Sequence, residues 1–159
     1  ALANGDNQSA SEMFAHILSE TPQDGDALLG MARIALGQSD TDAAEAWLKQ
    51  IESDNPCFER AEKLRGVIAF SEDAGPIGVL QATLAENPHD AETLYKLGAS
   101  FALSGQFEEA FDAFLKIVMV DREYREDGAR KALLSLFEVV GMEDPLVIAS
   151  RRRLASLLF

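Results

Sequence analysis

The sequence predicts an all-α solenoid of about nine antiparallel helices. Its apolar residues recur at the spacing that buries one face of a helix, and short breaks containing glycine or proline separate these stretches. The stretches form pairs that repeat along the chain, and similarly placed markers at Pro22, Pro56, Pro88 and Arg122 give steps of 34, 32 and 34 residues. Paired helices repeated at this period are typical of a solenoid, because each pair buries its apolar face against the next pair.

The clearest pair lies in residues 91–122, where Gly105 separates two amphipathic blocks. The blocks carry apolar and small residues at helical spacing, namely Leu94, Leu97, Gly98 and Phe101, then Ala110, Phe114 and Ile117. Gly98 and Ala110 are small enough to let two antiparallel helices approach closely, and the larger residues fill the seam. One pair cannot bury this surface alone, so the pattern predicts neighbouring pairs.

Two further pairs precede this unit. The second repeat has Leu29-Gly30 in its first helix and an apolar series in its second helix, at Ala44, Leu48 and Ile51. In the third repeat, Gly66 occupies the position of Gly98, in a first helix over 59–70. Its second helix begins at Pro76, where proline is tolerated in a first turn, and is short, with an apolar stripe of Ile77, Leu80 and Leu84.

The first repeat contains only the second half of the pattern. Residues 8–19 are predicted to form a second helix, because the unit reproduces the later spacing with Gly5, Ala10, Phe14, Ile17 and Pro22. The first helix of this pair would precede residue 1. A half-repeat leaves an apolar face uncovered, so we expect the chain to be the C-terminal part of a longer protein. The alternative is that residues 1–4 are the frayed end of a shorter helix.

The pattern changes after residue 121. Residues 126–140 carry one apolar face and end at Gly141, a suitable C-cap. Asp144 and Pro145 are predicted to be the N-cap and first residue of a last helix over 146–158. We therefore divide the chain into irregular repeats over 1–121, the first lacking its first helix, and a capping helical pair over 122–159.

The repeat unit resembles the tetratricopeptide (TPR) repeat of about 34 residues, which implies a right-handed solenoid. The order of the units and the C-terminal series resemble the C-terminal region of bacterial thioredoxin-like proteins with a TPR tail, the chaperedoxins. The residues that carry this resemblance are Gly141, Asp144, Pro145, Leu146, Arg151, Arg152, Leu154, Leu158 and Phe159.

This resemblance implies a cytoplasmic co-chaperone whose protein-binding TPR module holds unfolded clients, contacts partner chaperones, or does both. The redox cysteines of that family would lie upstream of Ala1, in an N-terminal thioredoxin-like domain, so no redox residue is assigned here. The alternative is a TPR scaffold or adaptor that holds one dedicated complex together, without chaperone activity.

The net charge of −13 argues against nucleic acid and anionic membranes as partners. This charge divides into −8 up to Pro56, −6 over residues 57–121 and +1 from Arg122 onward. No run of about 18 apolar residues suggests a membrane span. The single cysteine, Cys57, excludes an internal disulfide and is compatible with a reducing cytoplasm.

No pattern indicates a catalytic site, a metal site or a cofactor. His16 and His89 have no partner at metal-ligand spacing, and the many carboxylates fall in turns and first helical turns, where they complement the helix dipole. We therefore expect a binding protein rather than an enzyme. Cys57 is interpreted as a buried small residue; the alternative is a reactive thiol that forms a mixed disulfide with a client.

The inner face of such a solenoid is lined mainly by residues of each first helix. We expect an apolar groove for extended or unfolded segments, formed by Met31, Ile34, Lys63, Val67, Phe70, Tyr95, Lys96, Ala99 and Ala102. The alternative is that several of these are ordinary core residues. The grouped Arg151, Arg152 and Arg153 would either dock an acidic patch of a partner chaperone or pair with carboxylates of this chain, the interpretation we favour.

Overall fold

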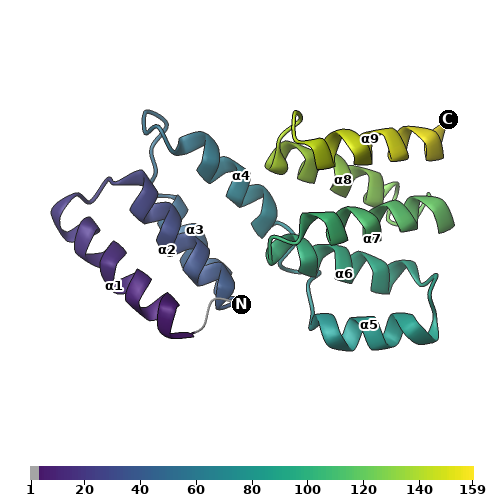
Figure 1. Ribbon diagram of the computed structural model, residues 1–159, viewed down its shortest axis with the longest axis horizontal. Helices are drawn as coiled ribbons and strands as arrows, with labels where there is room; N and C mark the ends of the chain where they lie inside the picture. The colour runs from purple at the N-terminus through teal and green to yellow at the C-terminus, as the bar shows by residue number, and fades with distance from the viewer. Residues whose placement is uncertain (1–3) are drawn as a thin grey trace. The chain divides into compact units, whose positions relative to one another are not determined.

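The computed structural model describes residues 4–159, and within this range the chain forms nine α-helices and no strand (Figure 1). The all-α prediction is confirmed. The chain divides into two compact units, Ala1–Arg65 and Gly66–Phe159. This boundary lies inside a helix, whereas the predicted division at residue 121 separates the repeats from their cap. The two units are described separately below.

The first unit contains α1 (Asn4–Glu20), α2 (Gly25–Gly37), α3 (Thr41–Leu48) and most of α4 (Phe58–Ile68). Helix α2 packs against both α1 and α3. Gly30 is required at the α1–α2 contact, because a Cβ there would lie 2.4 Å from the Phe14 ring. The centre of the unit is apolar and almost fully buried, with Leu28, Leu29, Ala32, Ala44, Leu48 and Ile51.

The second unit contains α5 (Ile77–Glu86), α6 (Ala91–Leu103), α7 (Phe107–Val120), α8 (Gly128–Val140) and α9 (Pro145–Leu158). Helix α6 packs between α5 and α7, and both α8 and α9 pack on α7 (Figure 1). The predicted close approach at Gly98 is confirmed, since a Cβ there would lie 2.6 Å from Cζ of Phe114. The expected capping pair, α8 and α9, thus belongs to the same compact unit as the clearest repeat.

Three sequence expectations about element ends are wrong. Helix α1 begins at Asn4 rather than at residue 8, so Gly5 lies inside it. A glycine permits a turn but can also continue a helix. Helix α4 ends at Ile68, so Phe70 lies in the turn that follows. Helix α8 begins at Gly128 rather than at residue 126, because Arg125, Glu126 and Asp127 adopt left-handed backbone conformations.

Aspartates cap four of the helices. Asp24, Asp40, Asp90 and Asp144 each accept a hydrogen bond from a backbone N–H in the first turn of α2, α3, α6 and α9, respectively. Such a bond satisfies one of the N–H groups that a helix start leaves without an intrahelical partner. The predicted caps at Asp144 and at Gly141, with φ of 117°, are confirmed.

Removing the Asp90 cap is expected to lower the free energy of unfolding by about 1 kcal/mol. Asp90 accepts from the Thr93 backbone N–H at 3.1 Å, and Asp90→Ala leaves that donor without its partner. Gln106→Ala is the matched control, because Gln106 is the N-cap of α7 and makes no side-chain cap bond. Urea unfolding followed by circular dichroism measures both. Equal losses for the two variants would contradict the assigned cap.

Among residues 4–159, no helix is both long and apolar enough to cross a membrane.

Candidate functional site

The predicted groove residues differ in their burial. Five are half-buried and retain some contact with solvent: Met31, Ile34, Lys63, Tyr95 and Lys96. The other four are buried: Val67, Phe70, Ala99 and Ala102. Because α6 packs between α5 and α7, residues on two sides of this helix are covered, and Ala99 and Ala102 belong to the apolar core with Phe70. These four are ordinary core residues, as the alternative interpretation had it.

The half-buried lysines are paired along their own helices. Nζ of Lys96 lies 3.0 Å from Oε1 of Glu92, and Nζ of Lys63 lies 3.8 Å from Oε1 of Glu59. These are surface pairs one helical turn apart, which contribute little to stability but reduce the local positive charge. Met31 contacts the Ser11 hydroxyl of α1, with 3.8 Å between Oγ and Sδ. The groove itself remains a prediction for these residues.

The three C-terminal arginines do not behave alike. Arg153 donates from Nη1 to Oδ1 of Asp112 at 2.6 Å, which ties α9 to α7. Within the part of the chain that the structure describes, Arg151 and Arg152 form no ion pair, and both side chains are exposed. The favoured interpretation of pairing with this chain's own carboxylates therefore holds for Arg153. Arg151 and Arg152 remain available to a partner.

Cys57 is buried, with 8% of its surface exposed, in the turn before α4. Asn55 fixes this turn, because its side chain accepts from the Cys57 backbone N–H at 2.9 Å and donates to the Gln23 carbonyl at 3.0 Å. A Cβ on the adjacent Gly25 would lie 2.7 Å from Cβ of Cys57, so the thiol packs closely against the start of α2. The burial of Cys57 agrees with the structural interpretation.

His16 and His89 are both exposed, and Nε2 of His16 lies 3.9 Å from Oε1 of Glu20. Across residues 4–159, no group of three or more histidine, cysteine or acidic side chains is arranged to hold a metal ion.

The connection between α7 and α8 has an unusual backbone that no sequence pattern predicted. Arg125, Glu126 and Asp127 have φ of 51°, 55° and 67°, so three successive residues with side chains are left-handed. Each such residue costs roughly 1–2 kcal/mol relative to a right-handed conformation. Gly128 makes the turn possible, since a Cβ there would lie 2.8 Å from Cβ of Arg125. Interactions elsewhere in the unit must offset this cost.

The Arg125 side chain supplies these interactions. Its guanidinium donates from Nη1 to Oδ1 of Asp73 at 2.8 Å and from Nε to the Tyr124 hydroxyl at 3.2 Å. It also lies over the Tyr95 ring, 4.3 Å from Cζ to the ring centroid, and 5.6 Å from the Tyr124 centroid. We call Asp73, Tyr95 and Tyr124 the acidic–aromatic cage. It recognises a guanidinium by charge, by hydrogen bonds and by cation–π contact.

The electrostatics of the cage favour the charged cation. The hydrogen bond to Asp73 raises the pKa of the Arg125 guanidinium, against the opposing effect of partial burial. Burial raises the pKa of the Tyr95 hydroxyl, and the Asp73 carboxylate adds to this rise while Arg125 opposes it. Tyr95 therefore remains neutral at physiological pH, with its ring packed edge-to-face on Phe114 at 5.2 Å between centroids.

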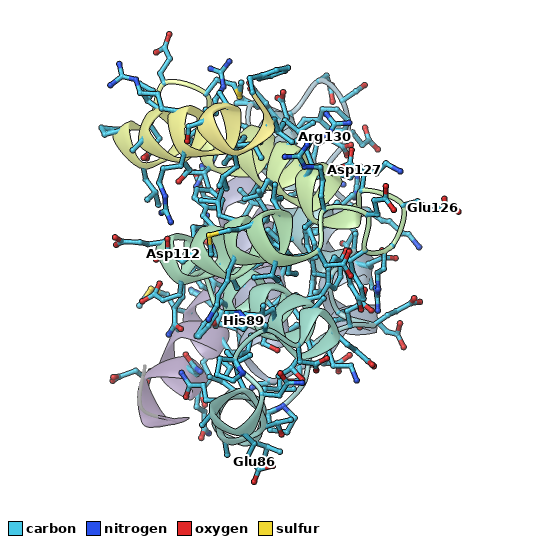
Figure 2. The ribbon with its side chains drawn as sticks, turned by 90° about the vertical axis from the view of Figure 1, so that its right-hand side faces the viewer. Glu86, His89, Asp112, Glu126, Asp127 and Arg130 are labelled. Atoms are coloured by element: carbon cyan, nitrogen blue, oxygen red, sulfur yellow. The ribbon has the colours of Figure 1, made fainter. Side chains whose placement is uncertain are left out.

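A surface pocket of about 690 Å³ lies beside the same connection. It is lined by charged residues of the turn and of α8 and by the end of α9: Arg122, Glu123, Glu126, Asp127, Arg130, Leu158 and Phe159. Its cations are engaged within the chain, because Arg122 donates to the Leu157 carbonyl at 2.6 Å and Arg130 pairs with Asp127. Figure 2 shows Asp127 and Arg130 close together, while Glu126 projects outward.

Comparison with known proteins identifies the repeat. Two tetratricopeptide-repeat families match this chain, one over residues 70–159 and the other over residues 1–68. An uncharacterized protein of Haemophilus influenzae is 30% identical over 143 residues, an alignment that covers 86% of this chain and 64% of that protein. The chain therefore spans less than two thirds of the relative's length. No solved structure matches the sequence significantly.

Proposed function

The chain belongs to the tetratricopeptide-repeat family, whose helical pairs serve as protein–protein interaction modules, and we propose that it binds unfolded clients as the TPR part of a thioredoxin-like co-chaperone. This proposal includes a cytoplasmic setting and binding without catalysis. Any redox chemistry would belong to a separate thioredoxin-like domain.

The observation that carries this proposal is the presence of exposed, adaptable apolar side chains on acidic repeats. Met13 on α1 is 63% exposed and Met119 on α7 is 61% exposed. Methionine is unbranched and polarizable, so it adapts to different apolar partners and suits a surface that binds many sequences. The repeats over residues 1–121 are strongly acidic, while residues 122–159 carry +1, and this acidity favours the solubility of a complex with an aggregation-prone chain.

The exposed arginine pair offers a second contact, for an acidic surface of a partner chaperone. Arg151 and Arg152 lie within residues 122–159, which carry a net charge of +1, whereas residues 1–56 and 57–121 are both acidic. Opposite charges at the rim of an interface mainly accelerate association and select the partner.

Neutralising this pair is expected to weaken binding to an acidic partner by roughly five- to tenfold, with a larger effect at low salt. The variant is Arg151→Gln with Arg152→Gln, and the probe is a fluorescent hexaglutamate peptide followed by anisotropy. Arg153→Gln is the control, because Asp112 already engages that guanidinium. Equal effects of the double variant and the control would contradict a docking role for the exposed pair.

A second candidate function is a scaffold for one dedicated complex. The burial of Val67, Phe70, Ala99 and Ala102 favours it, since these side chains are withdrawn from the surface and leave less apolar area for unfolded segments. Under this alternative the chain binds one folded partner with fixed stoichiometry and has no affinity for unfolded proteins.

Light scattering separates the two functions. A chemically denatured test protein is diluted into buffer with increasing amounts of the chain, and aggregation is followed over time. The co-chaperone proposal predicts suppression that saturates near equimolar chain. Unchanged aggregation, together with capture of one stoichiometric partner, would favour the scaffold.

A further inference from the structure

The acidic–aromatic cage is already occupied by a cation of the chain itself. Asp73 comes from the connection between α4 and α5, Tyr95 from α6, and Tyr124 from the connection between α7 and α8. All three contact the Arg125 guanidinium, yet the Arg125 side chain retains 39% exposure and that of Asp73 retains 27%. The site is therefore accessible from solvent at its occupied edge.

The residue that fills the cage has an unfavourable backbone conformation. Arg125 is the first of three left-handed residues, and the contacts of its side chain with the cage are what offset that conformation. Release of Arg125 would let residues 125–127 relax to right-handed or extended conformations. Replacement of Arg125 by another cation would therefore favour opening of the turn.

We propose that the acidic–aromatic cage is a recognition site for an arginine side chain of a partner protein, and that Arg125 closes it as an autoinhibitory, exchangeable occupant. The inference rests on the proposed protein-binding function and specifies the chemistry of one contact. The partner segment carries an arginine whose guanidinium donates a hydrogen bond to Asp73 and lies over the Tyr95 ring.

The charge and geometry of the site favour arginine over lysine and over neutral side chains. Arg125 uses two different nitrogens, Nη1 for Asp73 and Nε for Tyr124, while its Cζ lies over the Tyr95 ring. A guanidinium makes both bonds from one rigid fork, which a lysine ammonium cannot reproduce. The acidic chain, with its charge of −13, also attracts a basic segment over a longer range.

The test opens the cage and titrates it with a defined probe. Arg125→Gly removes the side chain and keeps a residue that tolerates positive φ, and Arg125→Asn is a second open variant of the same kind. The probe is the peptide acetyl-Gly-Arg-Gly-amide, and the signals are the ring protons of Tyr95 and Tyr124 in NMR spectra of the full 159-residue chain. Circular dichroism establishes that each variant retains its helices.

The open variants are expected to bind the arginine peptide at least about tenfold more tightly than the parent chain, because they lack the competing internal cation. Adding Asp73→Asn to Arg125→Gly should weaken that binding about tenfold, since a hydrogen bond to a charged group is lost. The matched peptide with citrulline in place of arginine should shift neither tyrosine, and the lysine peptide should bind more weakly than the arginine peptide.

Two results would overturn the proposal: tyrosine signals that do not respond to the arginine peptide in folded open variants, or a response that survives Asp73→Asn unchanged. The titration uses no client protein, so its failure would leave the light-scattering result intact. Conversely, loss of client binding would not affect the response of the tyrosine rings to the peptide.

Discussion

Phe111→Ala is expected to lower the free energy of unfolding of the second unit by about 3–5 kcal/mol, the largest effect of any substitution considered for this chain. Phe111 is fully buried, and its ring lies edge-to-face on Phe137, 5.1 Å between centroids and 80° between planes. The pair joins α7 to α8, so truncation removes both the buried area and the aromatic contact between the two helices.

Urea unfolding followed by circular dichroism measures this loss, and hydrogen exchange of the α7 amides assigns it to the second unit. Met119→Ala is the control on the same helix, because that side chain is 61% exposed and its removal should change stability by less than about 0.5 kcal/mol. A loss below about 1 kcal/mol for Phe111→Ala would show that the α7–α8 contact is not packed as described.

Gly98→Ala is expected to destabilise the second unit by about 1–3 kcal/mol, although alanine favours helices over glycine. The added Cβ would lie 2.6 to 2.9 Å from three ring atoms of Phe114, which is fully buried and cannot move away without displacing its own neighbours. Gly37→Ala is the matched control, because a Cβ at Gly37 meets nothing within 4 Å. It should be neutral or slightly stabilising.

A second substitution tests the cause of the Gly98 effect. The three close atoms are Cζ, Cε1 and Cε2 of Phe114, and leucine lacks all of them. In the Phe114→Leu background, Gly98→Ala should therefore cost much less than in the parent chain, so that the two effects are not additive. Strict additivity would mean that the cost at Gly98 does not come from the Phe114 ring.

Local chemistry explains which parts of the fold the sequence predicts well. Gly105, with φ of 76°, and Gly141, with φ of 117°, occupy positions that few other residues tolerate, and Asp144 caps the helix that follows it. Each of these signals depends only on residues a few places away. The pairing of the helices followed from repetition of the same local pattern.

The same local pattern misled at Gly5, which has the expected spacing yet lies inside α1. A glycine permits a turn but does not impose one.

The burial of the predicted groove residues depended on contacts that a single helix does not reveal. Ala99 and Ala102 are buried on α6, a helix that packs against both α5 and α7. Arg153 illustrates the intermediate case: a carboxylate partner was expected, but only the packing of α9 on α7 selects Asp112.

The cage had no usable signal in the sequence. Arg125 and Asp73 are 52 residues apart, in two connections that carry no periodic pattern. The left-handed residues before Gly128 are arginine, glutamate and aspartate, and of these only aspartate is moderately common in that conformation. The structure was needed to bring the three cage residues together and to place a guanidinium between them.

Hydrogen–deuterium exchange in the presence of a permanently unfolded, cysteine-alkylated test protein tests the proposed client binding most directly. The proposal predicts slower exchange in helices of the repeats, centred on α1 and α7, which carry the exposed Met13 and Met119, and faster association at low salt for basic clients. Exchange that stays unchanged along the whole chain with excess unfolded protein would contradict client binding and favour a scaffold.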